Sequence, residues 1–324
     1  MSMQRKAKVK RACIVLLGIL AAALVLPAGA AAQVRYLSLA TGSPGGVYFP
    51  LGGAMADLLS SLLPDVHVTA ESTAASVENS RLVGARRADM GMALGSVAYK
   101  ALHGMAPFTE PLNVRALFQM YPAPQHLVTL KGSGIRSVRD LRGRRVSTEA
   151  PGSGAETIAL IILKAYGIDP DRDIRRARLS QTESADALKD RVIDAAFYNF
   201  AYPASVVVEM ATVRDIDLVP LDPDVLERII QENPFFVRSV IPAGVYSGVN
   251  HDVLALGDSN VVIAHASMPE ELAYRIVKTI FENATRLHPV HPVAQQLVPQ
   301  NAVNSPIPLH PGAERYFREV GALR

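Results

Sequence analysis

The sequence contains a single cysteine, Cys13, and no tryptophan. Cys13 falls in an N-terminal segment that we expect to be removed, so the mature chain would have no cysteine. That absence excludes a disulfide framework, thiol catalysis and cysteine-ligated metals. We therefore expect packing alone to hold the fold together.

Net charge is also small, and the familiar catalytic motifs are missing. Removing the five Lys/Arg of the N-terminal segment leaves 28 against 30 Asp/Glu, a net charge of −2, so nucleic-acid or membrane-surface binding is not indicated. The sequence has no nucleophile elbow, phosphate-binding P-loop, HExxH or GxGxxG. His288 and His291 lie close together between prolines, which favours a solvated loop over a metal site. We expect no metal and no cofactor.

The first 32 residues have the order of a secretory signal peptide. Basic residues between positions 5 and 11 precede an apolar run over residues 12–26, and small residues follow up to Ala32. The apolar run is too short for a membrane span, so cleavage after Ala32 is expected. Lys10 and Arg11 stand where a lipoprotein leader would be hydrophobic, so Cys13 is not a lipid-attachment site. The simplest compartment is a bacterial periplasm, and a secreted protein would have the same leader.

A glycine-rich turn joins a strand to a helix near the start of the mature chain. We expect the strand over residues 34–39 and the helix over 51–63, with Gly42, Gly45 and Gly46 between them. Unpaired backbone N–H groups and the helix dipole at such a helix start favour an anion. The alternative is that these glycines only make the turn.

Strands and helices then alternate. Strands are predicted over residues 66–70 and 90–94, with a polar turn over 71–76 and a helix capped by Ser76 between them. This rhythm indicates a parallel α/β sheet, in which ligands bind beyond the carboxyl ends of the strands. Both turns of this first part should lie at that edge.

The chain is long enough for two domains. Residues 114–130 read as two strand halves interrupted by prolines, which sheets tolerate only at edges and breaks, so the chain is expected to change domain there. An apolar run over residues 253–264 would carry it back. We expect a first lobe from residues 33–125 and 245–324, and an inserted second lobe from residues 126–244.

A second glycine-rich helix start lies in the predicted second lobe, at residues 150–156. Ser153 and Glu156 have the spacing of a capping box, and apolar residues follow at helical spacing. A cap needs no ligand, but one such turn in each lobe is what a two-jawed anion site would require. A further capping box is predicted at Ser180 and Glu183.

Several short blocks in this order resemble the TAXI-type solute receptors of tripartite ATP-independent periplasmic (TRAP) transporters. The blocks are Ala40-Thr41-Gly42, Gly45-Gly46-Val47-Tyr48, residues 75–79, Tyr121-Pro122, His126-Leu127, residues 150–156, residues 194–197 and residues 241–246. The similarity covers almost the whole mature chain. Each block alone is weak, but their order is specific.

The resemblance implies a type II periplasmic binding-protein fold, with two α/β lobes and a ligand cleft between them. It implies a receptor, not an enzyme, that delivers a small organic anion or amino acid, usually suspected to be glutamate or a dicarboxylate, to TRAP transporter membrane subunits driven by an ion gradient. The sequence departs from the family where Val47 replaces a frequent Thr, and where Leu94 and Ser96 replace Gln and Asp. A less polar pocket wall follows, so glutamate is not assumed.

We expect ligand closure to bring residues of both lobes together. Backbone N–H groups near the glycines and a set of polar and aromatic side chains are the candidate contacts. They are Ser43, Gly45, Gly46, Val47, Tyr48, Ser76, Asn79, Tyr121, His126, Gly152, Ser153, Gly154, Phe197, Tyr198 and Tyr202. For Tyr121 and Phe197 a core position is an equal alternative.

Two other functions remain open at this point. An enzyme on the same architecture would need a carboxylate and a histidine in the cleft, and Glu78 with His126 is the only pair that the sequence suggests. A sensor that presents its ligand to a membrane kinase would have the same sequence features. Substrate turnover would identify the enzyme, and a neighbouring gene for a many-span transporter subunit would favour transport over sensing.

Overall fold

The computed structural model describes residues 34–233 and 235–323. The expected signal peptide over residues 1–32, with Cys13, lies outside the described residues. From Tyr36 onward the chain packs as one compact unit. Within the described ranges, no helix is long and apolar enough to cross a membrane.

The first lobe is built on three strands and the helices that follow them. In chain order these are β1 (Arg35–Ala40), α2 (Tyr48–Leu62), β2 (Val66–Glu71), α3 (Ser76–Gly84), β3 (Met90–Leu94) and α4 (Gly95–His103). The strand order is β2-β1-β3-β10, with β1 parallel to β3 and β10 antiparallel to β3. Every residue of β3 is buried, as expected for the centre of an α/β sheet covered on both faces.

The second lobe repeats this arrangement. It contains β5 (Arg145–Ser147), α5 (Gly154–Ala165), β6 (Arg175–Ala177), α6 (Gln181–Lys189), β7 (Ala195–Asn199), α7 (Ser205–Val213), β8 (Ile216–Leu218) and α8 (Pro223–Glu232). The order is β6-β5-β7-β4, with β5 parallel to β6 and β7, while β8 pairs with the end of β4. In the first lobe β1 lies between β2 and β3, and in the second lobe β5 lies between β6 and β7.

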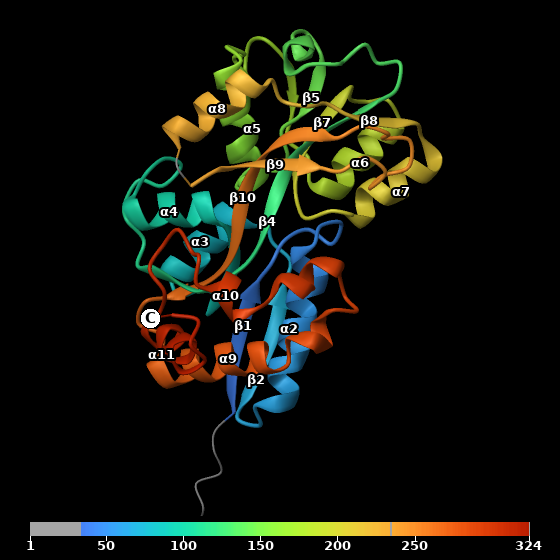
Figure 1. The fold of residues 1–324 in the computed structure, drawn as a ribbon. Helices are drawn as coiled ribbons and strands as arrows, with labels where there is room; N and C mark the ends of the chain where they lie inside the picture. Colours follow the sequence, from blue (N-terminus) through green and yellow to red (C-terminus); the bar gives the residue numbers. More distant parts are fainter. Residues whose placement is uncertain (1–33, 234, 324) are drawn as a thin grey trace, which may run out of the picture. The chain divides into compact units, whose positions relative to one another are not determined.

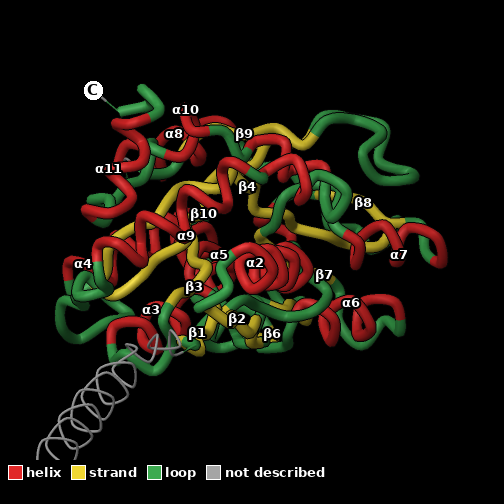
Figure 2. The backbone as a smooth tube through the Cα atoms, turned by 90° about the horizontal axis from the view of Figure 1, so that it is seen from below, coloured by secondary structure: helices red, strands yellow, loops and turns green. Residues whose placement is uncertain are grey.

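Two long antiparallel strands, β4 (Val114–Leu130) and β10 (Val253–His265), connect the two lobes (Figure 1). Figure 2 shows these two strands side by side among the helices. The predicted interruption of β4 was wrong, because the strand runs unbroken through Pro122 and Pro124. Both prolines lie opposite β10, and β4 pairs with β7 only from Gln125 onward. The N–H groups that the prolines lack are therefore not required for hydrogen bonds to β7.

The remaining elements lie outside the two repeated patterns. β9 (Val237–Ile241) pairs with residues 253–257 of β10, beyond the part of β10 that pairs with β3, and it contacts α8. α9 (Glu270–Glu282) packs against α11 (Pro311–Glu319) and α2. Shorter elements are α10 (Pro299–Ala302) and the 3₁₀ turns η1 (Val138–Leu141), η2 (Ala284–Leu287) and η3 (Pro292–Gln296).

Helix caps were partly predictable. Ser180 and Glu183 form the expected capping box, and Ser153 accepts a hydrogen bond from the Glu156 backbone N–H. The Glu156 carboxylate does not close that box: its Oε1 binds Arg176 and Arg178, and its Oε2 accepts from the Gly152 N–H at 3.3 Å. Ser76 is not an N-cap but the first residue of α3, following Ala75 with a φ of 71°.

Candidate functional site

A small cavity lies where the carboxyl ends of the strands of the two lobes face each other. Its volume is about 60 Å³. Most of its wall comes from the carboxyl ends of β1, β2, β3, β5, β6 and β7 and the segments that follow them, as expected for ligand sites of open α/β sheets, and Tyr121 reaches it from the middle of β4. The lining residues are Gly42, Ser43, Gly46, Val47, Tyr48, Thr73, Ala74, Ala75, Ser76, Leu94, Tyr121, Glu149, Ala150, Ser153, Gly154, Ala155, Ser180, Gln181, Asn199 and Phe200.

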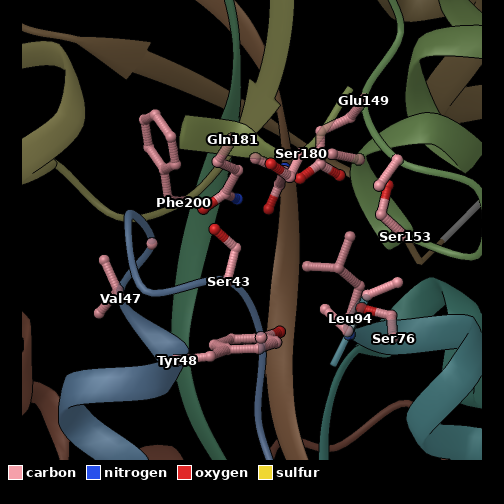
Figure 3. Close-up of a pocket in the computed structure, with 18 of the residues that line it drawn as sticks. Ser43, Val47, Tyr48, Ser76, Leu94, Glu149, Ser153, Ser180, Gln181 and Phe200 are labelled. Carbon is pink, nitrogen blue, oxygen red and sulfur yellow. Dashed lines mark hydrogen bonds between the residues drawn. The ribbon is translucent and has the colours of Figure 1, made fainter. Parts of the chain in front are cut away.

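Hydrogen bonds fix the turn that follows β1. The Thr41 backbone N–H donates to the Glu71 carbonyl at 2.9 Å, and its hydroxyl donates to the same oxygen at 2.7 Å. Ser72 donates to the Gly42 carbonyl at 3.0 Å. These bonds tie the turn to the end of β2, so Ser43 points into the cavity from a fixed backbone (Figure 3).

Tyr48, at the start of α2, forms part of the cavity floor. Its hydroxyl donates to the side-chain oxygen of buried Asn260, and the Asn260 amide donates to the Tyr121 carbonyl at 3.0 Å. Burial raises the pKa of Tyr48 well above its ordinary value, so this phenol stays neutral. The Tyr121 hydroxyl is buried and finds no hydrogen-bond partner within the described chain.

Glu149 follows β5 and is the one carboxylate among the described residues that line the cavity. Its side chain points from its loop toward Ser180 and Gln181 (Figure 3). Only 5% of the residue is exposed, and its backbone has a φ of 77°, a conformation that favours glycine. The Ser147 hydroxyl accepts a hydrogen bond from the Glu149 N–H at 3.3 Å.

The surroundings of Glu149 disfavour its charged form. Burial raises the pKa of Glu149 to about 8, a hydrogen bond from the Ser153 side chain opposes this rise, and the charge of Glu156 adds to it. The nearby arginines are engaged elsewhere: Arg176 and Arg178 contact the Glu156 carboxylate at 2.6 and 2.7 Å.

Five helices begin at the cavity. Their N-cap residues, Val47, Ala75, Leu94, Ser153 and Ser180, all line it. Such helix starts together create a positive potential without a cationic side chain.

The starts of α3 and α4 are bound by groups from elsewhere in the chain. The Gly152 carbonyl accepts from the Val77 and Glu78 N–H groups of α3, at 3.0 and 3.2 Å. The Asp258 carboxyl accepts from the N–H and hydroxyl of Ser96 in α4. Burial raises the pKa of Asp258 to about 7, and its bonds to Ser96 oppose the rise. The starts of α5 and α6 are capped by their own Ser153 and Ser180 hydroxyls, and α2 has no side-chain cap, so these three starts are those most suited to an anionic ligand group.

The two walls touch around the cavity. A β-carbon on Gly45 would lie 2.7 Å from the Thr182 hydroxyl, and one on Gly46 would lie 2.3 Å from the Gln181 side-chain oxygen. A β-carbon on Gly154 would lie 2.5 Å from Leu94 Cδ1. The glycines of both predicted turns thus allow the two walls to approach closely in this structure.

The structure brings together about half of the predicted site residues. Ser43, Gly46, Val47, Tyr48, Ser76, Tyr121, Ser153 and Gly154 line the cavity. Outside its lining lie Gly45, Asn79, His126, Gly152, Phe197, Tyr198 and Tyr202.

Asn79 and His126 are engaged in the protein interior. The Asn79 amide donates to the carbonyls of Ala40, Thr41 and Met92 at 3.1, 2.7 and 2.7 Å, so it ties β1 to β3. His126 is fully buried against the Tyr246 hydroxyl at 3.1 Å, and burial lowers its pKa to about 4. The predicted enzyme pair is therefore not assembled at the cavity.

The other predicted residues that do not line the cavity lie inside a strand, outside the cavity or at contacts between its two walls. Phe197 and Tyr198 are inside β7, where both strand faces are covered, and the cavity is reached only by Asn199 and Phe200 at its end. The Tyr202 hydroxyl points to the Val240 carbonyl at 3.4 Å. Gly45 and Gly152 support contacts between the lobes instead of the cavity wall.

Glu149, Gln181, Asn199 and Phe200 are the main residues that sequence reasoning missed. Each follows the end of a second-lobe strand or begins the next helix, so the strand-end rule used for the first lobe could have found them. Leu94 does line the cavity, at a position where the sequence indicated a less polar wall.

Several solved proteins are similar to this chain over most of its length. A solved protein from Bordetella bronchiseptica RB50 matches with 16% identity over 89% of this chain and 89% of its own, with a TM-score of 0.52. The binding protein component of an ABC phosphonate transporter from Pseudomonas aeruginosa matches with 12% identity over 81% and 80%, with a TM-score of 0.51. The alkanesulfonate-binding protein SsuA from Xanthomonas axonopodis pv. citri, bound to MOPS, matches with 17% identity over 91% and 82%, with a TM-score of 0.49.

The fold and the cavity between its lobes define a type II periplasmic binding-protein architecture. The model of the NMT1-like family matches residues 39–321. The chain belongs to the NMT1-like family.

Proposed function

We propose that this protein is a periplasmic solute-binding protein that captures a small organic acid or amino acid between its two lobes. The observation that carries the proposal is the cavity lined by residues after strands of both lobes and by five helix starts. A carboxylate placed there would accept hydrogen bonds from backbone N–H groups at α2, α5 and α6, each worth about 1.5–3 kcal/mol.

Closure would couple binding to a change of shape. A ligand that contacts both lobes binds the closed arrangement better than an open one, and only this difference can shift the equilibrium. We assign the hinge to β4 and β10, the strands that connect the lobes. The expected lobe boundaries at residues 125 and 245 lie near these strands and remain part of this proposal.

For the coupled machinery we propose TRAP transporter membrane subunits, on the resemblance of the ordered sequence blocks. The phosphonate neighbour is a component of an ABC transporter, so an ATP-driven importer is the competing assignment for the same fold. Uptake into vesicles with the co-purified membrane subunits distinguishes them. An imposed ion gradient without ATP should drive uptake if the TRAP assignment is right, whereas uptake that requires ATP contradicts it.

Ligand capture itself is tested by a thermal-shift screen of amino acids, dicarboxylates and keto acids on the purified protein. A ligand at about 100 times its Kd should add about 2.7 kcal/mol of stability and raise the Tm by several degrees. Absence of any shift, and of product when the same compounds are incubated with the protein, would contradict a receptor for these ligands. Product formation would instead support an enzyme.

A variant that fills the cavity, compared with a matched surface variant, tests where the ligand binds. Ser43→Trp places a large side chain in the cavity, whereas Ser61→Trp places it on the exposed side of α2. We expect the first variant to lose the ligand-induced shift and the second to keep it. An equal shift in both variants would place the ligand elsewhere.

A further inference from the structure

Glu149 occupies a backbone conformation that suits glycine better than glutamate. Its φ is 77°, it is 5% exposed, and its side chain points into the cavity (Figure 3). Strained positions of this kind persist where the surrounding structure imposes them, and they cluster at functional sites. The carboxyl group is thus held at the cavity against both backbone preference and desolvation.

The cavity wall, as far as the structure describes it, offers Glu149 no cationic partner. Among the described lining residues none is lysine, arginine or histidine. The charged and titratable groups that face it are Glu156 on α5, whose carboxylate is held by Arg176 and Arg178, and Tyr198 on β7. The Glu149 carboxyl accepts a hydrogen bond from the Ser153 side chain and points toward Ser180 and Gln181, while the Ser147 hydroxyl contacts the Glu149 backbone N–H. A buried carboxylate needs a counter-charge or a proton.

Further acceptors line the same cavity. The side-chain oxygens of Gln181 and Asn199 are buried and have no hydrogen-bond partner in residues 34–233 and 235–323. The Asn199 amide nitrogen donates to the Ala123 carbonyl at 3.4 Å, which leaves its oxygen as the acceptor. An ammonium group has three donors and a positive charge, so it suits this set, whereas a keto or hydroxyl group brings at most one donor.

Resting on the proposed function, we infer that Glu149 selects solutes that carry an ammonium group, so that the ligand is an amino acid. The ligand carboxylate lies at the starts of α2, α5 and α6, and the ammonium group lies against Glu149 with the oxygens of Gln181 and Asn199 nearby. A dicarboxylate or keto acid would place no cation there. The carboxyl group that excludes such anions is the same one that recognises the amine.

The test compares matched ligands that differ only at the amine. Calorimetric titrations use L-glutamate against 2-oxoglutarate, L-aspartate against L-malate, and L-alanine against L-lactate. In each pair that binds, we expect the wild type to favour the amino acid by about 10- to 100-fold, the value of one charge-assisted hydrogen bond. Glu149→Gln and Glu149→Gly should lose this preference, and glycine also suits the observed φ. Glu110→Gln, an exposed change of the same charge, should keep it.

Proton release on ligand binding is a second measurement, and it would not change if Glu149 had only a structural role. With the cavity walls in contact, burial raises the pKa of Glu149 to about 8, so without a cation its carboxyl is mostly protonated at pH 7, and an ammonium ligand should release about one proton more than its oxygen analogue does. Titrations in phosphate and Tris buffers measure this release. Glu149→Gln should release none.

The outcomes separate this inference from the proposed function. Equal or tighter binding of the oxygen analogues by the wild type, or an amine preference that survives in Glu149→Gln, overturns the role of Glu149 but leaves a solute receptor. Tight binding of dicarboxylates without proton release would also overturn it, because Glu149 would then stay protonated and donate to an anion. Failure of every ligand to bind the wild type overturns the proposed function and this inference together.

Discussion

Gly154→Ala should weaken ligand binding without unfolding the protein. Gly154 is the first residue of α5, and a β-carbon there would lie 2.5 Å from Leu94 Cδ1 and 2.6 Å from the Ser76 hydroxyl oxygen. Non-bonded carbon atoms prefer about 3.5–4.0 Å, so the lobes would have to separate by about 1 Å or repack, at about 1–3 kcal/mol. Because an open arrangement lacks this clash, the cost falls on closure.

That cost corresponds to an affinity about 5- to 150-fold lower, measured by calorimetric titration with the best amino acid of the panel. Small-angle scattering should show a larger radius of gyration for the variant than for the wild type at equal, subsaturating ligand. Gly53→Ala in α2 is the matched control, because a β-carbon there meets nothing within 4 Å. If Gly154→Ala binds as tightly as Gly53→Ala, closure over this contact is refuted.

Three other predictions concern the support of the cavity, its pH response and processing. Tyr48→Phe leaves the side-chain oxygen of buried Asn260 without its donor and should lower the free energy of unfolding by about 1–3 kcal/mol in urea titrations; no change would contradict the network. In the folded protein the pKa of Asp258 is raised to about 7, whereas in the unfolded chain it is near 4. The folded state therefore binds the proton more tightly, and the free energy of unfolding should fall by about 4 kcal/mol as the pH rises from about 4 to 7. Asp258→Asn, which can still bond Ser96, should flatten that slope in denaturation series from pH 4 to pH 8, and an unchanged slope would contradict it. Mass spectrometry of the exported protein should find Gln33 at its N-terminus, and an uncleaved chain would refute the leader.

Local patterns in the sequence were sufficient to predict the glycine-rich turn of the first lobe. The apolar spacing around Gly42 and Gly46 defines a strand, a turn and a helix, and a strand end next to a helix start is where an α/β sheet binds ligands. Ser43, Tyr48 and Ser76, which the sequence proposes as ligand contacts, line the cavity.

The second-lobe wall was harder to predict because its key residues look ordinary in sequence. Glu149 reads as the end of a strand, and the Ser180–Glu183 capping box explains its own residues without a ligand. Only the pairing of β5, β6 and β7 shows that these strand ends face the first lobe. The sequence does not show that the Asn79 amide donates hydrogen bonds to three backbone carbonyls, because those carbonyls belong to two chain segments that are far apart in sequence.

The most direct test of capture between the lobes is a crystal structure of the protein with the best-binding amino acid of the panel. We expect the ligand carboxylate at the starts of α2, α5 and α6, and the amine within hydrogen-bond distance of the Glu149 carboxylate. A ligand bound outside the cavity, or held by one lobe alone, would contradict the account.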